Sequence, residues 1–405
     1  MRVLCTTLGS PSHGRAQLPL LRALAGAGHQ VRVVTNETLA SVFRADAVDV
    51  LPALPEFDPS AMMGPYLGDL RAIADPAEQM AELTRLLPRA VSGPGVGRFL
   101  EILLPLAREY RPDLILRDGM DMAAVLTAEL LGVPQLPTPS GFSNTVDPAE
   151  LLPGLGERRR ELGLPVSDDP LSVVPHGRID YVPAAFSFAR HLPHSWAYRQ
   201  TVDVERGGKL PQWAAALPVD RPLVYAAVGT ALPMMHERAA DPSDPPVMEL
   251  PDATASLRTL LAAAAELEDC TVVVSTSGIP VETSALPGHV HVTERVAQPL
   301  LLESVDLFVT HGGFNSIREA MRTGTPLAVL PHFGDQPANA DRVEELGLGR
   351  HVTERSAAGI AEVCRKLLAD PTPRARARAA QLAMLTLPGI EQAVSDLEEI
   401  AGTSG

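Results

Sequence analysis

Two residues in the first half of the chain have the types and positions of a catalytic pair. His13 lies in the loop GSPSHGRAQ, just before an expected helix, and Asp118 ends the buried segment LILRD. An imidazole with a reference pKa of about 6.5 suits a general base at neutral pH. Asp118 could orient that base, as the acid of a catalytic triad does. Two structural alternatives stay open: His13 as a helix-end or surface residue, and Asp118, or Asp121 nearby, as the cap of the next helix.

A glycine pair in the second half is typical of a phosphate-binding turn. The segment THGGFNS (310–316) leads from a buried strand into a helix that we expect to begin at Asn315. Two glycines let the backbone approach a ligand closely, and a helix N-terminus offers N–H groups and a positive dipole end. The alternative is a structural glycine turn with an Asn cap. With the Gly-Thr turn that follows the first strand of this half, the candidate phosphate ligands are Thr230, His311, Gly312, Gly313, Asn315 and Ser316.

A carboxylate and an amide follow a later strand, in PHFGDQPANA. Asp335 and Gln336 together could hydrogen-bond vicinal hydroxyls, because the carboxylate accepts two bonds while the amide both donates and accepts. The alternative is that Asp335 caps the helix that starts at Pro337.

One nucleotide-binding motif is excluded and another is disfavoured. The spacing of Gly9 and Gly14 resembles a P-loop, but Arg15 and Ala16 replace its Lys and its Ser or Thr. Without that hydroxyl there is no side-chain ligand for Mg²⁺. Neither glycine turn of the second half matches G-x-G-x-x-G, which argues against a nicotinamide cofactor.

Two α/β halves are expected to position these residues. The first half alternates strand, helix and strand over 2–7, 15–27 and 31–35, and repeats the pattern with a strand over 111–118 and a helix ended by Gly132. Residues 140–220 are rich in Pro and lack clean periodicity, and the alternation restarts at Arg221. We expect an N-terminal Rossmann-like domain over 1–205, a linker over 206–220, a C-terminal Rossmann-like domain over 221–385 and a final segment over 386–405. The elements expected in the second half are helix 256–267, strand 271–275, strand 306–310, helix 315–323 and strand 327–330.

Composition limits the class of protein. The 405 residues are 45% apolar and 20% charged, as in a globular protein of two or three folding units. The net charge of −15 argues against nucleic acid or an anionic membrane as the main partner. The separated cysteines Cys5, Cys270 and Cys364 predict neither a disulfide framework nor a metal site. With no apolar run of about 18 residues and no signal sequence, we expect a cytoplasmic protein.

In combination, these motifs resemble a known enzyme family over nearly the whole chain. The loop histidine His13 is followed by Leu18–Leu20 and by G-H-x-V at 28–31. The second half contains RVAQ (295–298), HGGFNS (311–316), Glu319 and the Asp-Gln pair. The sequence therefore resembles the inverting glycosyltransferases of the UDP-glycosyltransferase superfamily, in particular the actinomycete enzymes that glycosylate antibiotics.

The resemblance implies a fold and a reaction. The fold would be GT-B: two Rossmann-like domains facing a central cleft, with a last helix, about 389–401, crossing back to the first domain. His13 would deprotonate a hydroxyl of a small natural-product aglycone, with Asp118 as its partner, and the oxygen would displace the diphosphate of a nucleotide sugar, which we expect to be dTDP-linked. No metal or cofactor would be needed. A homodimer stays open, because the sequence does not determine the oligomeric state. The implied nucleotide ligands are Thr230, Arg295, Val296, Gln298, His311, Gly312, Gly313, Asn315, Ser316 and Glu319, with Glu319 on the ribose. Asp335 and Gln336 would hold the donor sugar.

Four positions depart from the family pattern. Ser12 and Ala16 replace a Gly and a Pro around the loop histidine, Arg295 stands where many relatives place Trp, and Ala297 replaces a Pro. A guanidinium can stack on a pyrimidine, so the base could be that of UDP or dTDP. The variable apolar segment around Met62 to Leu104 would line the acceptor site.

The alternatives are a sugar-nucleotide epimerase on the same fold and a non-catalytic sugar-nucleotide-binding auxiliary protein, which would not need His13.

Overall fold

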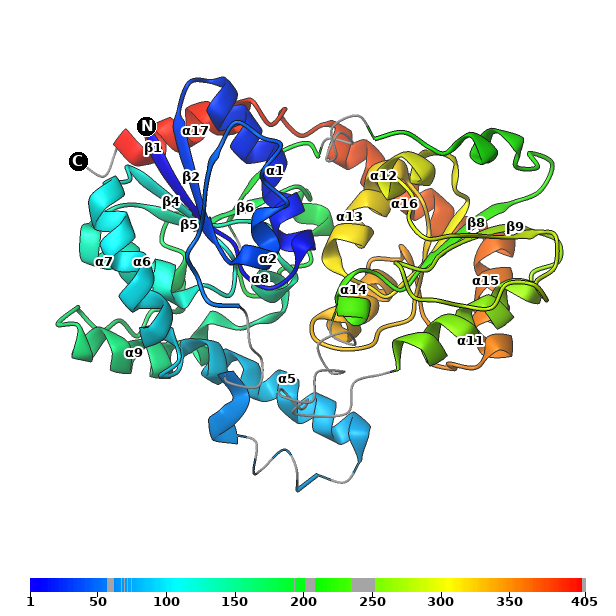
Figure 1. Ribbon diagram of the computed structural model, residues 1–405, viewed down its shortest axis with the longest axis horizontal. Coiled ribbons are helices and arrows are strands. Elements are labelled where there is room, and N and C mark those ends of the chain that lie inside the picture. The colour runs from blue at the N-terminus through cyan, green and yellow to red at the C-terminus, as the bar shows by residue number, and fades with distance from the viewer. Residues whose placement is uncertain are drawn as a thin grey trace. The chain divides into compact units, whose positions relative to one another are not determined.

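The chain forms two compact α/β units, drawn in Figure 1, a ribbon view of the computed structural model. The first unit comprises Met1–Thr201 and Leu387–Gly405, and the second comprises Val202–Thr386. The structure describes residues 1–56, 62–66, 68, 70, 72, 73, 75–192, 194–200, 208–234 and 252–402. Within the expected acceptor segment Met62 to Leu104, positions 67, 69, 71 and 74 lie outside the described residues.

A five-stranded parallel sheet forms the centre of the first unit, in the order β3-β2-β1-β4-β5. Its strands are rich in Val, Leu and Ile and are buried on both faces where they are central, as parallel sheets covered by helices require. The strands are β1 (Arg2–Thr6), β2 (Gln30–Thr35), β3 (Asp49–Pro52), β4 (Leu114–Arg117) and β5 (Gln135–Pro137), with a small parallel pair β6 (Arg178–Asp180) and β7 (Ser195–Ala197). Because β1 and β4 are neighbours, with Cys5 opposite Leu116, the residues that follow these two strands lie at the same edge of the sheet.

Helices cover this sheet, and the last helix of the chain belongs to the same unit. The helices are α1 (Pro11–Gly26), α2 (Glu37–Ala40), α5 (Pro76–Ser92), α6 (Val96–Tyr110), α7 (Met122–Leu131), α8 (Gly141–Thr145), α9 (Leu152–Glu161) and α17 (Gln392–Gly402), with short 3₁₀ turns at Gly64–Tyr66, Pro148–Glu150, Pro170–Val173 and Ala184–Phe186. Helix α17 contacts α1, and Tyr198 donates its phenolic hydrogen to Asp396 Oδ2 at 2.7 Å. These contacts attach the C-terminal segment to the first unit.

A six-stranded parallel sheet forms the centre of the second unit, in the order β10-β9-β8-β11-β12-β13. Its strands are β8 (Leu223–Ala227), β9 (Thr271–Ser275), β10 (Val290–Thr293), β11 (Leu307–Thr310), β12 (Leu327–Val329) and β13 (Gly349–His351). Its helices are α11 (Ala253–Ala265), α12 (Gln298–Leu301), α13 (Phe314–Thr323), α14 (Gln336–Glu345), α15 (Ala357–Ala369) and α16 (Pro371–Leu385), with 3₁₀ turns at Gln212–Ala216 and Leu302–Ser304. Since β8, β11 and β12 are adjacent, the three loops that follow them share one edge of the sheet.

Three expected helix starts are wrong by a few residues. The helix expected at 15–27 begins at Pro11, because proline has the backbone angle of the first helical position. The helix expected at 256–267 begins at Ala253, because Asp252 accepts hydrogen bonds from the next N–H groups. The helix expected at Asn315 begins at Phe314, with Gly313 at the N-cap position.

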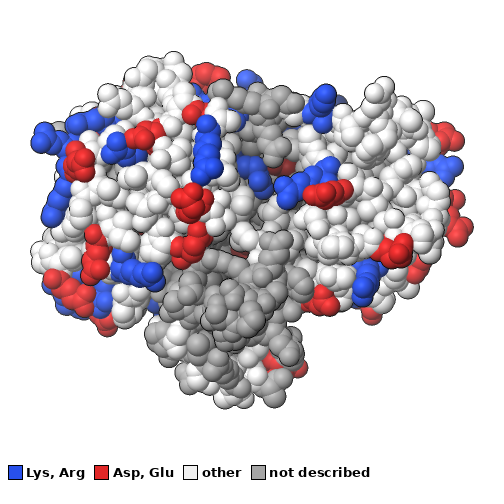
Figure 2. Space-filling model, viewed as in Figure 1, with Lys and Arg blue, Asp and Glu red and all other residues white. Residues whose placement is uncertain are grey.

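The described surface carries both signs of charge. On the face drawn in Figure 2, basic side chains stand beside acidic ones on each unit. None of the helices among the described residues combines the length and the apolar character needed to cross a bilayer.

Candidate active site

His13 and Asp118 are in direct contact in the first unit. His13 Nδ1 lies 2.7 Å from Asp118 Oδ2, although the two residues are 105 positions apart. His13 belongs to the first turn of α1 and not to a loop before it, so its expected loop position is wrong while its place at the sheet edge holds. The imidazole is 24% exposed and the carboxylate only 1% exposed. A solvent-accessible imidazole that is oriented by a buried carboxylate can act as a general base.

Asp118 is held as an anion. Its Oδ1 accepts from Met120 N–H at 3.0 Å, and its Oδ2 accepts from Leu8 N–H at 3.3 Å. Burial alone would raise the pKa of Asp118, but the nearby imidazole of His13, the hydrogen bond to it and the two backbone bonds together lower this pKa. A carboxylate can only accept hydrogen bonds, so His13 Nδ1 carries the proton and Nε2 carries the lone pair.

The capping role falls to Asp121. Its Oδ1 accepts from Ala124 N–H at 2.9 Å, which satisfies one of the first N–H groups of α7. Asp118 lies three residues before this cap and makes its contact to the imidazole instead. The alternative of Asp118 as the helix cap is therefore wrong, because the neighbouring carboxylate occupies that position.

Glycine and serine residues shape the turn around His13. Gly9 has a φ of +78°, and a Cβ placed there would lie 3.1 Å from His13 Cε1, so the turn brings its backbone against the imidazole. Ser12, one of the departures from the family pattern, has its hydroxyl 2.6 Å from that of Ser10. The other departure, Ala16, is buried, and its carbonyl accepts from Tyr181 Oη at 2.9 Å.

In the second unit, the glycine turn leads into a helix without a side-chain cap. Gly312 has a φ of +86°, and Gly313 occupies the N-cap position of α13. The first hydrogen bond of the helix runs from Ile317 N–H to Gly313 O at 3.2 Å, so the preceding N–H groups have no carbonyl partner inside the helix. Such N–H groups at the positive end of the helix dipole form an anion site.

His311 lies between two glycines at this turn. A Cβ at Gly229 would lie 2.3 Å from His311 Cε1, and a Cβ at Gly313 would lie 2.4 Å from His311 Nε2. Burial lowers the pKa of His311 to about 4, so the ring is neutral at pH 7. Within the described part of the chain, its Nδ1 is buried without a hydrogen-bond partner. A buried polar atom of this kind is costly unless a ligand or water satisfies it.

We therefore expect Gly229→Ala to weaken nucleotide binding about tenfold or more. The new Cβ would introduce about 1–3 kcal/mol of strain, and moving His311 away from its place would relieve that strain. Gly229 has a φ of +77°, so the new Cβ is strained as well as in contact with the ring. Gly347→Ala is the matched control, since Gly347 has a φ of +71° but its Cβ would lie 3.4 Å from Arg376 Cγ. Calorimetric titration with a nucleoside diphosphate compares the two variants. Equal dissociation constants would contradict a role for His311 in binding.

Gln298 joins two of the expected nucleotide ligands. Its Nε2 donates to Ser316 Oγ at 3.2 Å and to Glu319 Oε2 at 2.7 Å. Because Ser316 accepts here, its own hydroxyl hydrogen can point to another acceptor. The structure thus brings Gln298, Ser316 and Glu319 together on α12 and α13, at the edge where the glycine turn lies.

The Asp-Gln pair supports the glycine turn. Asp335 Oδ2 accepts from Asn339 Nδ2 at 2.8 Å, and the same Nδ2 donates to Gly312 O at 2.9 Å. Gln336 Oε1 accepts from His332 N–H at 2.8 Å. Asp335 is at the N-cap position of α14 but makes no side-chain cap bond.

Four expected nucleotide ligands are exposed, half-buried or in contact with another side chain. The Arg295 side chain is 81% exposed, with its Nε 3.8 Å from Glu294 Oε1. Thr230 is also exposed. Asn315 Oδ1 accepts from Arg318 Nη2, so its amide N–H₂ is the group suited to a phosphate. Val296 is half-buried.

Sequence reasoning missed two buried residues that support these groups. Asn339 is 1% exposed and lies one helical turn after Asp335, a spacing that places the two side chains on one face of α14. Arg117 is 1% exposed at the end of β4. A charged residue inside an otherwise apolar strand segment was the available signal for Arg117.

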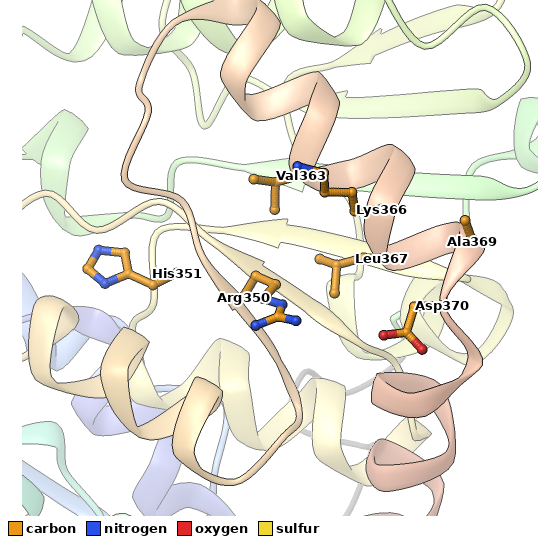
Figure 3. A pocket seen from close by; sticks show the side chains of 7 residues that line it. All are labelled: Arg350, His351, Val363, Lys366, Leu367, Ala369 and Asp370. Carbon is orange, nitrogen blue, oxygen red and sulfur yellow. The ribbon is translucent and has the colours of Figure 1, made fainter.

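A separate pocket occurs in the second unit, and none of the expected site residues lines it. It is lined by Arg350, His351, Val363, Lys366, Leu367, Ala369 and Asp370 (Figure 3). Its charged groups pair within the protein: His351 lies 3.0 Å from Asp341, and Lys366 lies 3.3 Å from Glu362. Among the described residues, no group of three His, Cys, Asp or Glu side chains is arranged to hold a metal ion.

Two family models match most of the chain. The N-terminal domain of the erythromycin biosynthesis protein CIII-like family matches residues 22–229, and its C-terminal domain matches residues 258–400. The L-demethylnoviosyl transferase of Streptomyces niveus is 28% identical over 391 residues, covering 93% of this chain and 92% of that protein. The 3-alpha-mycarosylerythronolide B desosaminyl transferase of Saccharopolyspora erythraea is 26% identical over 434 residues, covering 99% and 98%.

Solved structures share the fold. Spinosyn rhamnosyltransferase SpnG superposes with a TM-score of 0.74 at 22% identity, covering 98% of this chain and all of that one (100%). The glycosyltransferase SnogD from Streptomyces nogalater superposes with a TM-score of 0.73 at 22% identity, covering 99% of each chain. The predicted α/β fold of GT-B type, with parallel sheets in two units, is confirmed.

Proposed function

This chain belongs to the erythromycin biosynthesis protein CIII-like family of glycosyltransferases, and on that basis we propose that it transfers a deoxysugar from a dTDP-sugar to a hydroxyl of a natural-product aglycone. The family membership predicted from the motifs is thereby confirmed. The single observation that carries the chemical proposal is the 2.7 Å contact between His13 Nδ1 and Asp118 Oδ2.

His13 is the proposed general base. With the proton on Nδ1 held by the ionised Asp118, the Nε2 lone pair takes the proton of the acceptor hydroxyl. The acceptor oxygen then forms its bond to the anomeric carbon while the bond to the diphosphate breaks, which inverts the configuration. The proton stays on Nε2, and Asp118 stabilises the resulting imidazolium.

The second unit is the proposed donor site. The N–H groups at the start of α13 and the Ser316 hydroxyl would receive the negative charge that grows on the leaving diphosphate. The buried Nδ1 of His311 supports the same placement, because a neutral imidazole that donates one N–H would be satisfied by a phosphate oxygen. Thr230, Gly312, Gly313 and Asn315 complete this phosphate site in the proposal.

Other residues of the second unit would hold the rest of the donor. Glu319, already positioned by Gln298, would accept hydrogen bonds from the ribose hydroxyls. Asp335 and Gln336 would contact the donor sugar while also supporting the glycine turn. Val296 and Arg295 would lie beside the base.

The choice of dTDP and of a natural-product acceptor rests on similar proteins. One relative is the TDP-daunosamine transferase DnrS of Streptomyces peucetius, 25% identical over 432 residues. The structural neighbour SpnG is known complexed with thymidine diphosphate and with spinosyn aglycone. UDP is the alternative nucleotide. A non-catalytic auxiliary protein or an epimerase is less well supported, because neither needs the buried Asp118 to orient an accessible imidazole.

A thermal-shift screen tests the nucleotide directly. We expect dTDP to raise the melting temperature more than UDP or GDP, since a ligand at 100 times its dissociation constant stabilises the folded state by about 2.7 kcal/mol. The release of dTDP from a dTDP-sugar is then measured with and without an added aglycone. Release that depends on the aglycone would distinguish a transferase from an auxiliary protein and from an epimerase. Absence of a shift with all three nucleotides would contradict the proposal.

Arg295→Ala is expected to weaken binding of dTDP by about 0.5–2 kcal/mol through the loss of stacking on the base. The exposed guanidinium is only 3.8 Å from Glu294 and can reorient when a base is present. Because the base is remote from the reacting carbon, the donor KM should rise while kcat is unchanged. Calorimetric titration of dTDP and UDP into both proteins measures this, and unchanged dissociation constants for both would assign Arg295 to solvent.

A further inference from the structure

We propose that Arg117 is a positioning residue for the base: its buried guanidinium holds the backbone of Asp118 and Gly119 and thereby directs the carboxylate at His13. This inference rests on the proposed role of His13 as general base. It concerns the first unit alone, where all of the groups involved are described.

The contacts of Arg117 are directed at the turn that carries Asp118. Its Nη1 donates to Asp118 O and to Gly119 O, each at 3.1 Å. On the other side of the guanidinium, Nε donates to Gln135 Oε1 at 2.7 Å and Nη2 donates to Val173 O at 3.0 Å. A planar fork with fixed donor directions can join these four oxygens, whereas a flexible ammonium cannot.

These partners distinguish Arg117 from an arginine that serves an ion pair. All four acceptors are neutral oxygens, although the side chain is only 1% exposed. Burial lowers the pKa of Arg117 to about 10, and the nearby carboxylates of Asp121 and Asp118 oppose that shift, so the group stays charged at pH 7. Burying a charge is costly, and an apolar residue would fill the same space at lower cost. The geometry of the turn is what this charge maintains.

The turn is restrained from its other side as well. A Cβ at Gly119 would lie 2.2 Å from Ser140 Oγ and 2.3 Å from Ser143 Oγ, so the peptide packs directly against the N-terminus of α8. Arg117 on one side and α8 on the other thus restrain the Asp118 backbone. From this restrained backbone, Asp118 Oδ2 reaches His13 Nδ1 at 2.7 Å.

The tautomer of His13 reports this positioning without any substrate. In the native chain Asp118 holds the proton on Nδ1, whereas a free imidazole favours the proton on Nε2. Ring nitrogen chemical shifts of ¹⁵N-labelled histidine, at a pH where the ring is neutral, identify the tautomer, and His13→Ala assigns the signals. We expect the Nδ1–H form in the wild-type protein and a shift towards the Nε2–H form in Arg117→Met.

Arg159→Met is the matched control. Arg159 is equally buried in the first unit, at 2% exposure, but it forms a two-point ion pair with Glu129. This variant should lose stability and retain the Nδ1–H tautomer. Retention of the wild-type tautomer in Arg117→Met, or its loss in Arg159→Met, would overturn the proposal, and so would an Nε2–H tautomer in the wild-type protein.

A second variant covers the case in which Arg117→Met does not fold. Arg117→Lys retains the charge but cannot make the four hydrogen bonds. We therefore expect a mixture of the two His13 tautomers, with a smaller fraction of the Nδ1–H form than in the wild-type protein. A wild-type tautomer in Arg117→Lys would then overturn the positioning role. Failure of His13 as a base would appear separately, as transfer retained in His13→Ala, because the tautomer measurement does not depend on turnover.

Discussion

His13→Ala is expected to lower sugar transfer by about 100-fold or more, the range for loss of a positioned general base. The hydroxyl of an ordinary alcohol is a weak nucleophile until its proton is removed, and Nε2 of His13 is the group proposed to remove it. Binding of dTDP should be unchanged, because the proposed phosphate ligands belong to the second unit. Steady-state kcat with an alcohol acceptor and calorimetric titration of dTDP measure the two effects separately.

The control for this variant is His351→Ala. His351 also forms a His–Asp pair, with its Nδ1 3.0 Å from Asp341 Oδ1, but Asp341 is exposed and the pair lies in the second unit. Its removal should leave transfer within about twofold, as for most surface changes. Near wild-type turnover of an alcohol by His13→Ala would rule out the base role. A strongly acidic phenol is unsuitable for the test, because it ionises without a base.

Asp118→Asn is expected to slow transfer by between about 100-fold and 10,000-fold, the upper value being that known for the Asp-to-Asn change in the serine protease triad. The new amide would present N–H groups to His13 Nδ1, which would then have to accept a hydrogen bond. The ring proton would move to Nε2, and the lone pair that takes the acceptor proton would be lost. Transfer kinetics, with the melting temperature measured in parallel, test this expectation.

Asp121→Asn is the matched change at the neighbouring carboxylate. Asn caps a helix about as well as Asp does, so the bond to Ala124 N–H should survive and transfer should change little. If Asp118→Asn lowers only the melting temperature and retains transfer, Asp118 is a structural residue. Equal losses of transfer in the two variants would mean that the charge of this region matters, and not the contact with His13.

Much of the local structure follows from short stretches of sequence. The strand Thr271–Ser275 was expected at its observed bounds, because a β-branched run between polar segments depends on few other residues. The helix start at Pro11 was missed, because the glycine and serine residues around it are typical of a loop. Proline is nevertheless favoured at the first position of a helix. Gln298 was expected as a nucleotide ligand, but its bonds to Ser316 and Glu319 depend on two helices meeting.

By itself the sequence determined the residue types of the site, the alternation of strands and helices, and the family. Those features depend on neighbours along the chain and on spaced motifs, which a linear pattern records. The family resemblance implied Asp118 as the partner of His13, but the local pattern left Asp118 and Asp121 both open, and only the tertiary structure shows the contact. Asp118 and Asp121 are three residues apart and chemically identical, but β1 and β4 are paired with Cys5 opposite Leu116, and this register directs Asp118 to the imidazole. Strand order follows from burial of the whole sheet, so a contact across 105 residues has no local signal.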